Sequence, residues 1–215
     1  MKHPDDIAAK CAALDPRYGV DAAVAERIAR FAAHLAKWQK AINLIGRSTE
    51  AKVWERHILD SLQLVPLISA ESRVIVDLGS GAGFPGMILA LFGRWEVHLV
   101  ESDTRKAVFL RDSARACGVA VEVMARRIET VEAPKADVVT ARALAPVAEL
   151  LRLSAGIRRS GTICLFPKGR GVQAELTDAE KTWTLRFDTI PSITDPHGVI
   201  LKIDEAREHG SGSTA

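Results

Sequence analysis

The sequence predicts an α/β protein built on a doubly wound, mostly parallel sheet, with an antiparallel hairpin at one edge and helices at the N-terminus. Three observations predict this fold. A short apolar run at residues 73–78 opens directly onto a glycine-rich loop. From there apolar runs alternate with helical segments to about Lys181, as in a parallel sheet. The last two apolar runs have only a turn between them, which is typical of a hairpin.

The N-terminal helices are indicated by apolar residues at helical spacing. From Asp21 onward one stripe recurs at intervals of four and three residues, and it consists of Val24, Ile28, Phe31, Leu35, Trp38 and Ile42. A second helix is predicted over about residues 49–68, with Ser48 or Thr49 as its N-cap. Its apolar side is formed by Val53, Trp54, Ile58, Leu62 and Val65. We therefore expect residues 1–70 to form a helical extension packed on the core.

The core is expected over residues 71–209. The predicted strands are residues 73–78, 96–100, 121–124, 137–141 and 162–166, and the predicted helices begin near Pro85, Asp103, Ile128 and Pro146. Residues 184–190 and 199–204, separated by the turn-rich SITDPHG, form the edge hairpin. Residues 210–215, GSGSTA, are small and polar and predict a flexible tail.

The composition is that of an ordinary globular chain, with 215 residues of which 47% are hydrophobic and 26% charged. No apolar run approaches the roughly 20 residues of a membrane span, and the first residues lack the pattern of a signal peptide. We expect a cytoplasmic protein that does not enter the membrane. Three widely spaced cysteines, Cys11, Cys117 and Cys164, predict buried thiols and not a disulfide framework or a zinc site.

Charge is distributed unevenly along the chain. Residues 105–171 contain thirteen Lys or Arg against six Asp or Glu, a net of +7, whereas the whole chain carries only +2. A clustered basic excess of this kind attracts a phosphate backbone, although ordinary solvated helix faces give the same count.

The glycine-rich loop is the most informative motif. Asp77-Leu-Gly79-Ser-Gly81-Ala-Gly83-Phe84-Pro-Gly86 follows a strand and opens a helix. Glycines let the backbone turn sharply and let a ligand lie against the main chain, and the N–H groups at the start of a helix are positive. About 20 residues later Glu101 ends the next strand, where a carboxylate can accept hydrogen bonds from both hydroxyls of an adenosine ribose.

Asp77 distinguishes between two classes of cofactor. A carboxylate at the end of the first strand would repel the pyrophosphate of a dinucleotide. The same carboxylate suits the ammonium group of methionine, so the loop favours S-adenosylmethionine, which also carries a sulfonium cation. A nicotinamide-dependent oxidoreductase and a purely structural glycine turn are the alternatives for this loop.

The sequence lacks two motifs that other methyl acceptors require. Enzymes that methylate exocyclic amines commonly have Asp or Asn, two prolines and an aromatic residue near the fourth strand, and this chain has Thr140-Ala-Arg142-Ala-Leu-Ala-Pro146 there. Carbon methylation of pyrimidines needs a nucleophilic cysteine, usually next to proline. None of the three cysteines in this chain is next to proline. A ring nitrogen with a free lone pair, such as purine N7, needs neither and is compatible with the sequence.

Basic residues at the ends of two strands predict a rim beside the cofactor loop. Arg142 ends the fourth strand and Lys168 ends the fifth, at the edge where open α/β sheets bind ligands. Arg142 is therefore a candidate for positioning the substrate, and no residue is predicted to act as base or nucleophile. His57 and Asp60 share one face of the second helix, but a lone histidine is usually structural, and no metal site is predicted.

Several motifs together resemble a known family. In order along the chain they are Asn43-Leu44, His57-Ile-Leu-Asp60-Ser61-Leu62, the loop from Asp77 to Gly86, Glu101-Ser102, Phe109-Leu110, Arg126 to Glu129, Thr140-Ala-Arg142-Ala and Lys168-Gly169. Over residues 26–204 the chain resembles the bacterial 16S ribosomal RNA guanine-N7 methyltransferases, also called the glucose-inhibited division protein B family. The resemblance implies a Rossmann-like S-adenosylmethionine-dependent methyltransferase that acts on N7 of guanine 527, in the 530 loop of 16S rRNA.

The resemblance also implies which residues bind the cofactor and the RNA. The cofactor residues it implies are Gly79, Phe84, Ile128, Glu129 and Arg142, to which the chemistry of the loop adds Asp77, Gly81 and Glu101. The residues expected to bind RNA are Arg47, His57, Arg126, Arg142, Lys168 and Arg170. Thr140 stands where the family commonly has serine.

We expect a monomer whose partner is 16S rRNA or the small ribosomal subunit. A methyltransferase of another RNA or of a small molecule, a nicotinamide-dependent oxidoreductase and a non-catalytic RNA-binding module are the alternatives.

Overall fold

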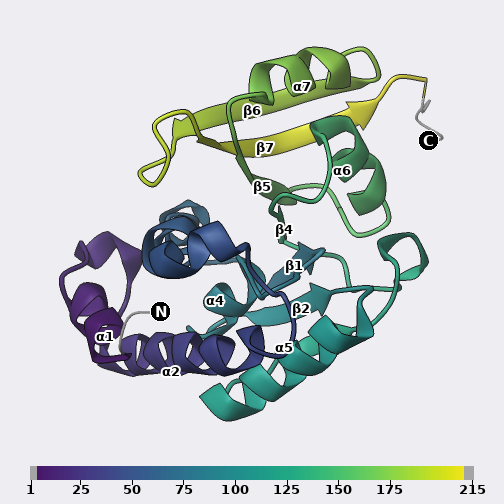
Figure 1. The fold of residues 1–215 in the computed structure, drawn as a ribbon. Helices are drawn as coiled ribbons and strands as arrows, with labels where there is room; N and C mark the ends of the chain where they lie inside the picture. Colours follow the sequence, from purple (N-terminus) through teal and green to yellow (C-terminus); the bar gives the residue numbers. More distant parts are fainter. Residues whose placement is uncertain (1–3, 211–215) are drawn as a thin grey trace.

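The computed structural model describes residues 4–210 and contains one seven-stranded sheet (Figure 1). The strands are β1 (Val74–Leu78), β2 (Glu96–Val100), β3 (Glu122–Met124), β4 (Val138–Ala141), β5 (Ile163–Lys168), β6 (Trp183–Pro191) and β7 (Val199–Glu208). They lie in the order β3-β2-β1-β4-β5-β7-β6. β1 to β5 are parallel to one another, while β7 runs antiparallel to both β5 and β6. The predicted doubly wound sheet with an antiparallel edge hairpin is therefore confirmed.

Helices and short helical turns connect the strands and precede them. The α-helices are α1 (Pro4–Ala12), α2 (Ala22–Gln39), α3 (Asp60–Leu62), α4 (Gly86–Ala90), α5 (Thr104–Cys117), α6 (Val147–Ser154) and α7 (Val172–Ala179). The other helical segments are η1 (Pro16–Tyr18), η2 (Arg47–Lys52), η3 (Trp54–Leu59), η4 (Val65–Leu67) and η5 (Ile128–Thr130). Helix α1 was not predicted.

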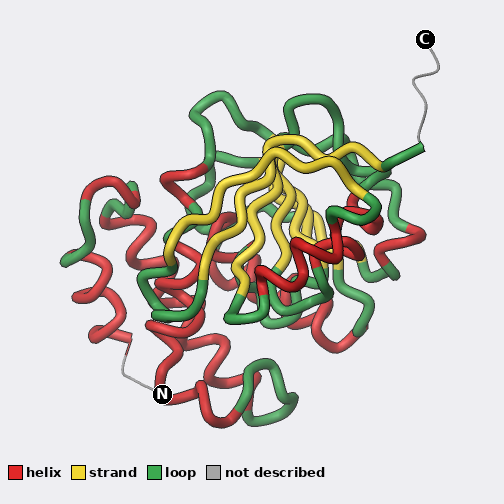
Figure 2. Tube along the Cα trace, turned by 90° about the horizontal axis from the view of Figure 1, so that it is seen from above, coloured by secondary structure: helices red, strands yellow, loops and turns green. Residues whose placement is uncertain are grey.

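Each face of the sheet carries its own hydrophobic core. Figure 2 shows helices on both sides of the strands. In β1, Ile75 packs with α2, α4 and α5, whereas its neighbour Val76 packs with α6 and α7 on the opposite face. Side chains of a strand alternate between faces, so a strand covered on both faces must be apolar throughout. This explains why β1 appears in the sequence as a continuous apolar run.

Helix α2 forms where the sequence predicts it. The Asp21 side chain accepts a hydrogen bond from the Val24 amide (2.8 Å) and so caps the helix. Val24, Ile28, Phe31 and Leu35 are buried in the same core as Ile75 of the sheet. Residues of the N-terminal helices and of the sheet thus share one hydrophobic cluster.

The second predicted helix, residues 49–68, is wrong as a single helix. Its apolar residues are buried as expected, but the segment consists of a 3-10 turn (η2), a π-helical turn (η3), the short α3 and a second 3-10 turn (η4). The first turn begins at Arg47 after Gly46, so neither Ser48 nor Thr49 caps it. A π-turn widens the helix, and Pro66 lacks the amide that a continuing α-helix would need.

The helix predicted to begin near Ile128 is also wrong. Only the 3-10 turn η5 forms there, and residues 131–137 are irregular up to the start of β4. Pro134 lies in this stretch and cannot continue a helical hydrogen-bond pattern.

Further expectations concern the membrane, the thiols and the tail. Within residues 4–210 no helix is long and apolar enough to cross a membrane. Cys11, Cys117 and Cys164 are buried free thiols, as predicted. The predicted flexible tail lies outside the described residues except for Gly210.

Gly86 should be intolerant of any side chain, because a Cβ there would lie 2.5 Å from both Asp77 Oδ2 and Leu99 Cδ2. We expect Gly86→Ala to lower the free energy of unfolding by about 1–3 kcal/mol. Urea denaturation measures this difference. Gly156→Ala is the matched control, because nothing lies within 4 Å of the added methyl group, and an equal loss in both variants would contradict the steric explanation.

Candidate functional site

The glycine-rich loop lies at the centre of the sheet. It follows β1, which has β2 on one side and β4 on the other, so the chain connections leave in opposite directions at this point. Ligands bind at such a switch point, beyond the carboxyl ends of the strands. Gly79 has a positive φ of 65°, as do Gly81 (55°) and Gly83 (87°), a conformation that L side chains rarely adopt.

Asp77 lies beneath this loop and is fully buried. Its Oδ1 accepts a hydrogen bond from Thr140 Oγ1 on β4 (2.6 Å), and its Oδ2 lies against Gly86. Burial raises the pKa of Asp77 to about 6, against the opposing effect of its hydrogen bonds. The threonine at position 140 keeps the hydroxyl that serine would supply. Asp77 supports the loop from below, and its contact with a methionine ammonium group stays a prediction.

Glu101 connects the loop to the next helix. Its Oε2 accepts a hydrogen bond from the Gly81 amide (2.7 Å), and its Oε1 accepts one from the Asp103 amide (2.7 Å). Two acceptor positions of the carboxylate remain for a ligand. Asp103 in turn caps α5 by accepting from the Arg105 and Lys106 amides.

A first cavity of about 480 Å³ lies over the loop. Six of the predicted cofactor residues line it: Gly79, Gly81, Glu101, Ile128, Glu129 and Arg142. Its volume is within the range of small-molecule sites, about 300–1,000 Å³. The turn η5, found in place of a helix, supplies Ile128 and Glu129.

A second cavity of about 700 Å³ lies beside the first. Its walls come from the N-terminal segment, the loop, the ends of β4 and β5, and the β6–β7 connection, and they include Thr49, His57, Asp60, Phe84, Arg142, Lys168 and Asp195. Phe84, predicted as a cofactor residue, lines this second cavity.

The two cavities meet at the glycine loop and at the short segment that follows β4. Gly79, Gly81 and residues 142–145 line both cavities. Leu144 lies directly over Gly79, since a Cβ on that glycine would be 2.7 Å from Leu144 Cδ1. Ala143 has a positive φ of 53°, unusual for a residue with a side chain, and Leu144 is 38% exposed despite being apolar. The segment thus forms the wall between the two cavities.

Arg142 is held by three groups of the N-terminal segment. Its Nη1 donates to the Arg56 carbonyl (2.8 Å) and to Asp60 Oδ2 (3.2 Å), and its Nη2 donates to His57 Nδ1 (2.8 Å). Its guanidinium lies 5.2 Å from the centre of the Phe84 ring, on which His57 also stacks. Of its five N–H donors, two have no protein partner among the described residues.

His57 is a neutral acceptor in this network. Burial, together with the charges of Arg142 and Arg56, lowers its pKa from 6.5 to about 3. Because an arginine can only donate, Nδ1 of His57 is unprotonated and Nε2 carries the proton. That Nε2 lies 2.9 Å from Thr49 Oγ1 and donates to it.

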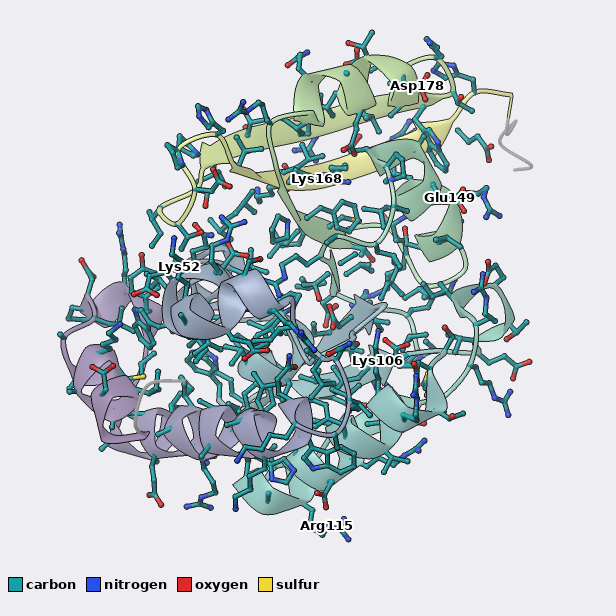
Figure 3. All side chains as sticks on the ribbon, in the orientation of Figure 1. Lys52, Lys106, Arg115, Glu149, Lys168 and Asp178 are labelled. Carbon is teal, nitrogen blue, oxygen red and sulfur yellow. The ribbon has the colours of Figure 1, made fainter. Side chains whose placement is uncertain are left out.

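Lys168 of the predicted basic rim is also paired. Its Nζ donates to Glu175 Oε2 (2.7 Å) and to the Ala145 carbonyl (2.8 Å), and its side chain is only 10% exposed. It fixes the segment that carries Leu144. Figure 3 labels Lys168 near the upper strands and Lys106 on α5 below.

The remaining residues predicted to bind RNA lie in separate places. Arg126 is exposed on the wall of the first cavity. Arg47 is exposed in a third cavity, beside α5. Arg170 is exposed one residue beyond Gly169, which lines the second cavity. The structure therefore brings His57, Arg142 and Lys168 together at the second cavity and places Arg126 with Arg142 at the first, whereas Arg47 and Arg170 line neither cavity.

The β6–β7 connection contributes residues that the sequence did not indicate. Thr194 donates to Asp60 Oδ1 (2.7 Å), and Arg56 pairs with Asp195 (3.1 Å). In the sequence, Thr194 and Asp195 belong to the stretch SITDPHG, which indicates only a turn. Leu144 was also missed, although an apolar residue in a loop is a weak signal for a contact surface.

We expect Arg142→Met to raise the pKa of His57 above its value of about 3, because the variant removes a neighbouring positive charge. An NMR titration of the histidine ring signals measures this change. Arg115→Met is the control, since Arg115 is 78% exposed and pairs with Asp112 on α5. A His57 titration that is the same in wild type and Arg142→Met would show that burial alone keeps the ring neutral.

Several of the solved structures with similar folds are methyltransferases. A SAM-dependent methyltransferase from Aquifex aeolicus superposes with a TM-score of 0.57 at 12% identity, covering 81% of this chain and 98% of that one. The TYW2 protein of M. jannaschii, solved in complex with AdoMet, gives a TM-score of 0.54 at 16% identity over 79% of this chain and 80% of that one. At these identities the likeness shows the fold alone.

Sequence comparison is far more specific. A protein of Rhodospirillum centenum named ribosomal RNA small subunit methyltransferase G is 53% identical over 193 residues, 90% of this chain and 89% of its own length. The protein of the same name from Gluconobacter oxydans is 48% identical over 84% of this chain and 93% of its own length. The family described as rRNA small subunit methyltransferase G matches residues 24–197. The chain therefore belongs to the rRNA small subunit methyltransferase G family.

Proposed function

We propose that the chain transfers a methyl group from S-adenosylmethionine to N7 of guanine 527 in 16S rRNA. The observation that carries this proposal is the pair of cavities that meet at Gly79 and Leu144. In the proposed arrangement the methyl donor occupies the first cavity and the guanine enters the second. Membership of an rRNA methyltransferase family supports the same reading.

The residues of the first cavity fit the proposed donor. Glu101 offers its remaining acceptor positions to the ribose hydroxyls, and Ile128 offers an apolar contact to the adenine. The main chain at Gly79 and Gly81 has no Cβ between it and a ligand. Asp77 is buried and lines neither cavity, so in the proposed arrangement it would act on the methionine ammonium group through its charge and through its support of the loop. When bound, S-adenosylmethionine supplies an electrophilic methyl group for in-line transfer.

The second cavity suits a nucleophile that needs no deprotonation. N7 of guanine carries a free lone pair, so the protein must align it but need not remove a proton. Neutral His57 has both ring nitrogens engaged, by Arg142 and Thr49. The three cysteines are buried, and burial raises the pKa values of Cys11 and Cys164 to about 12 and of Cys117 to about 11, which does not suit a covalent mechanism.

Arg142 is the proposed positioning residue. Arginine commonly pairs with O6 and N7 of guanine, but N7 must stay open toward the methyl donor. We infer that one of the two unpartnered N–H groups of Arg142 donates to O6. The contacts to Asp60, His57 and the Arg56 carbonyl keep the guanidinium at the junction of the cavities. Arg126 and Arg170, which are both exposed, would add positive charge around the RNA, and such a substrate would place the enzyme in the cytoplasm.

Gly79→Ala should weaken the binding of S-adenosylhomocysteine about tenfold or more. The added methyl group would strain the backbone and collide with Leu144, pushing it into the cavity. Calorimetry with S-adenosylhomocysteine measures the effect. Gly93→Ala is the matched control, because Gly93 has a similar φ of 69° but nothing within 4 Å. Equal losses in both variants would contradict the assigned cavity, and binding of NAD in place of S-adenosylhomocysteine would favour an oxidoreductase.

The acceptor is tested on small subunits from a strain that lacks this gene. The wild-type protein should add one N7-methylguanine at position 527, which mass mapping of 16S rRNA detects. Because Arg142 lines both cavities, wild type and Arg142→Ala are compared at saturating S-adenosylmethionine. There the variant should lower the rate of methylation about 10- to 100-fold, the worth of a hydrogen bond from a charged donor. Methylation at another nucleotide would overturn the assignment to guanine 527, and a methyl group on another atom of the base would overturn the assignment to N7. An unchanged map would overturn the proposed function.

A further inference from the structure

A third cavity, of about 780 Å³, lies where the end of α2 faces the first turn of α5. Its walls include Gln39, Lys40, Asn43, Arg47, Arg105 and Lys106. We refer to it as the α2–α5 groove. Helices α2 and α5 pack against each other along their length (Figure 1).

The groove carries positive charge that the protein leaves unneutralised. Within residues 4–210, Lys40, Arg47 and Lys106 make no ion pair, and the first two are exposed. Glu50 and Asp103 also line the groove, and against Lys40, Arg47, Arg105 and Lys106 they leave a net charge of +2 (four positive, two negative). Glu50 accepts from Gln39 (2.8 Å), and Asp103 caps α5 and pairs with Arg105. At the second cavity, by contrast, Arg142 and Lys168 are paired with Asp60 and Glu175.

The groove joins the first proposed substrate cavity and lies on the other side of residues 43–50 from the second. Lys106 lines the groove and also the first cavity. Residues 43–50 separate the groove from the second cavity: Asn43, Arg47 and Glu50 face the groove, and Leu44, Ile45 and Thr49 face the cavity.

This dividing segment is fixed by Gln39. Its side-chain oxygen accepts from the Leu44 and Ile45 amides (2.9 and 3.0 Å), and its Nε2 donates to the Ile45 carbonyl (2.9 Å). The groove therefore keeps a defined position relative to the site.

We propose that the α2–α5 groove binds the sugar-phosphate backbone of the RNA strand next to the target guanine. This inference rests on the proposed function. The three cations come from different elements, the end of α2, the start of η2 and the first turn of α5, so they suit an extended polyanion better than one small anion. Backbone contacts of this kind set the register of a strand without reading its sequence. The base then reaches the second cavity around residues 43–50.

The salt dependence of RNA binding tests the groove. Each phosphate contact contributes about 0.7 to the slope of log K against log salt for a single strand. Lys40→Gln/Arg47→Gln should therefore lower the magnitude of the slope by about 1.4 for small subunits, and weaken binding at low salt. Lys106 is left intact because it lines the first cavity, and S-adenosylhomocysteine binding should not change. Filter binding over a range of salt concentrations measures the slope.

Lys181→Gln/Arg207→Gln is the matched control, since it removes the same charge from exposed side chains elsewhere (70% and 82% exposed). A slope unchanged from wild type, or an equal change in both double variants, would contradict the proposal that the groove binds the RNA backbone. Displacement of RNA by inorganic phosphate at constant ionic strength would also overturn it, in favour of a small-anion site. If the wild-type protein methylates 16S rRNA, any of these results refutes only RNA binding by the groove. If the wild-type protein neither binds nor methylates small subunits, the proposed function is refuted as well.

Discussion

One buried carboxylate joins the elements that form the site. Asp77 lies at the end of the central strand, and a charge in this position needs polar partners because burial disfavours its ionised form. Thr140 of β4 supplies a hydroxyl, and Gly86 lets the start of α4 approach without a Cβ in between. The glycine loop, the end of β4 and the segment that follows β4 are thereby held around a single point.

Arg142 gathers a second set of elements around that point. It continues from β4 and contacts His57 and Asp60, while Asp60 also accepts from Thr194 of the β6–β7 connection. The N-terminal segment, the centre of the sheet and its antiparallel edge therefore meet through one side chain. A charge so enclosed is costly unless it is paired and hydrogen-bonded, which explains why several polar groups converge on this guanidinium.

Local pattern in the sequence predicted most of the fold. The stripe of α2, the strands and the glycine loop are encoded in consecutive or regularly spaced residues, and they form where expected. The helix at Ile128 and the single helix over residues 49–68 were wrong, because periodicity does not reveal proline breaks or a π-turn. Pairs such as Asp60 with Thr194 were beyond reach, since 134 residues separate them. For the same reason the sequence suggested a basic rim without partners, whereas Arg142 is paired with Asp60, 82 positions earlier. Lys168 is also neutralised, by Glu175 on the helix that follows β5.

The wall formed by Ala143 and Leu144 gives the two proposed substrates separate routes. The first cavity is bordered on its outer side by η5 and α6, and the second by the N-terminal segment and the β6–β7 connection. In the proposed arrangement, S-adenosylhomocysteine leaves past η5 and α6 while the modified base still occupies the second cavity. Release of the spent donor and release of the modified RNA become independent events, and neither product has to wait for the other.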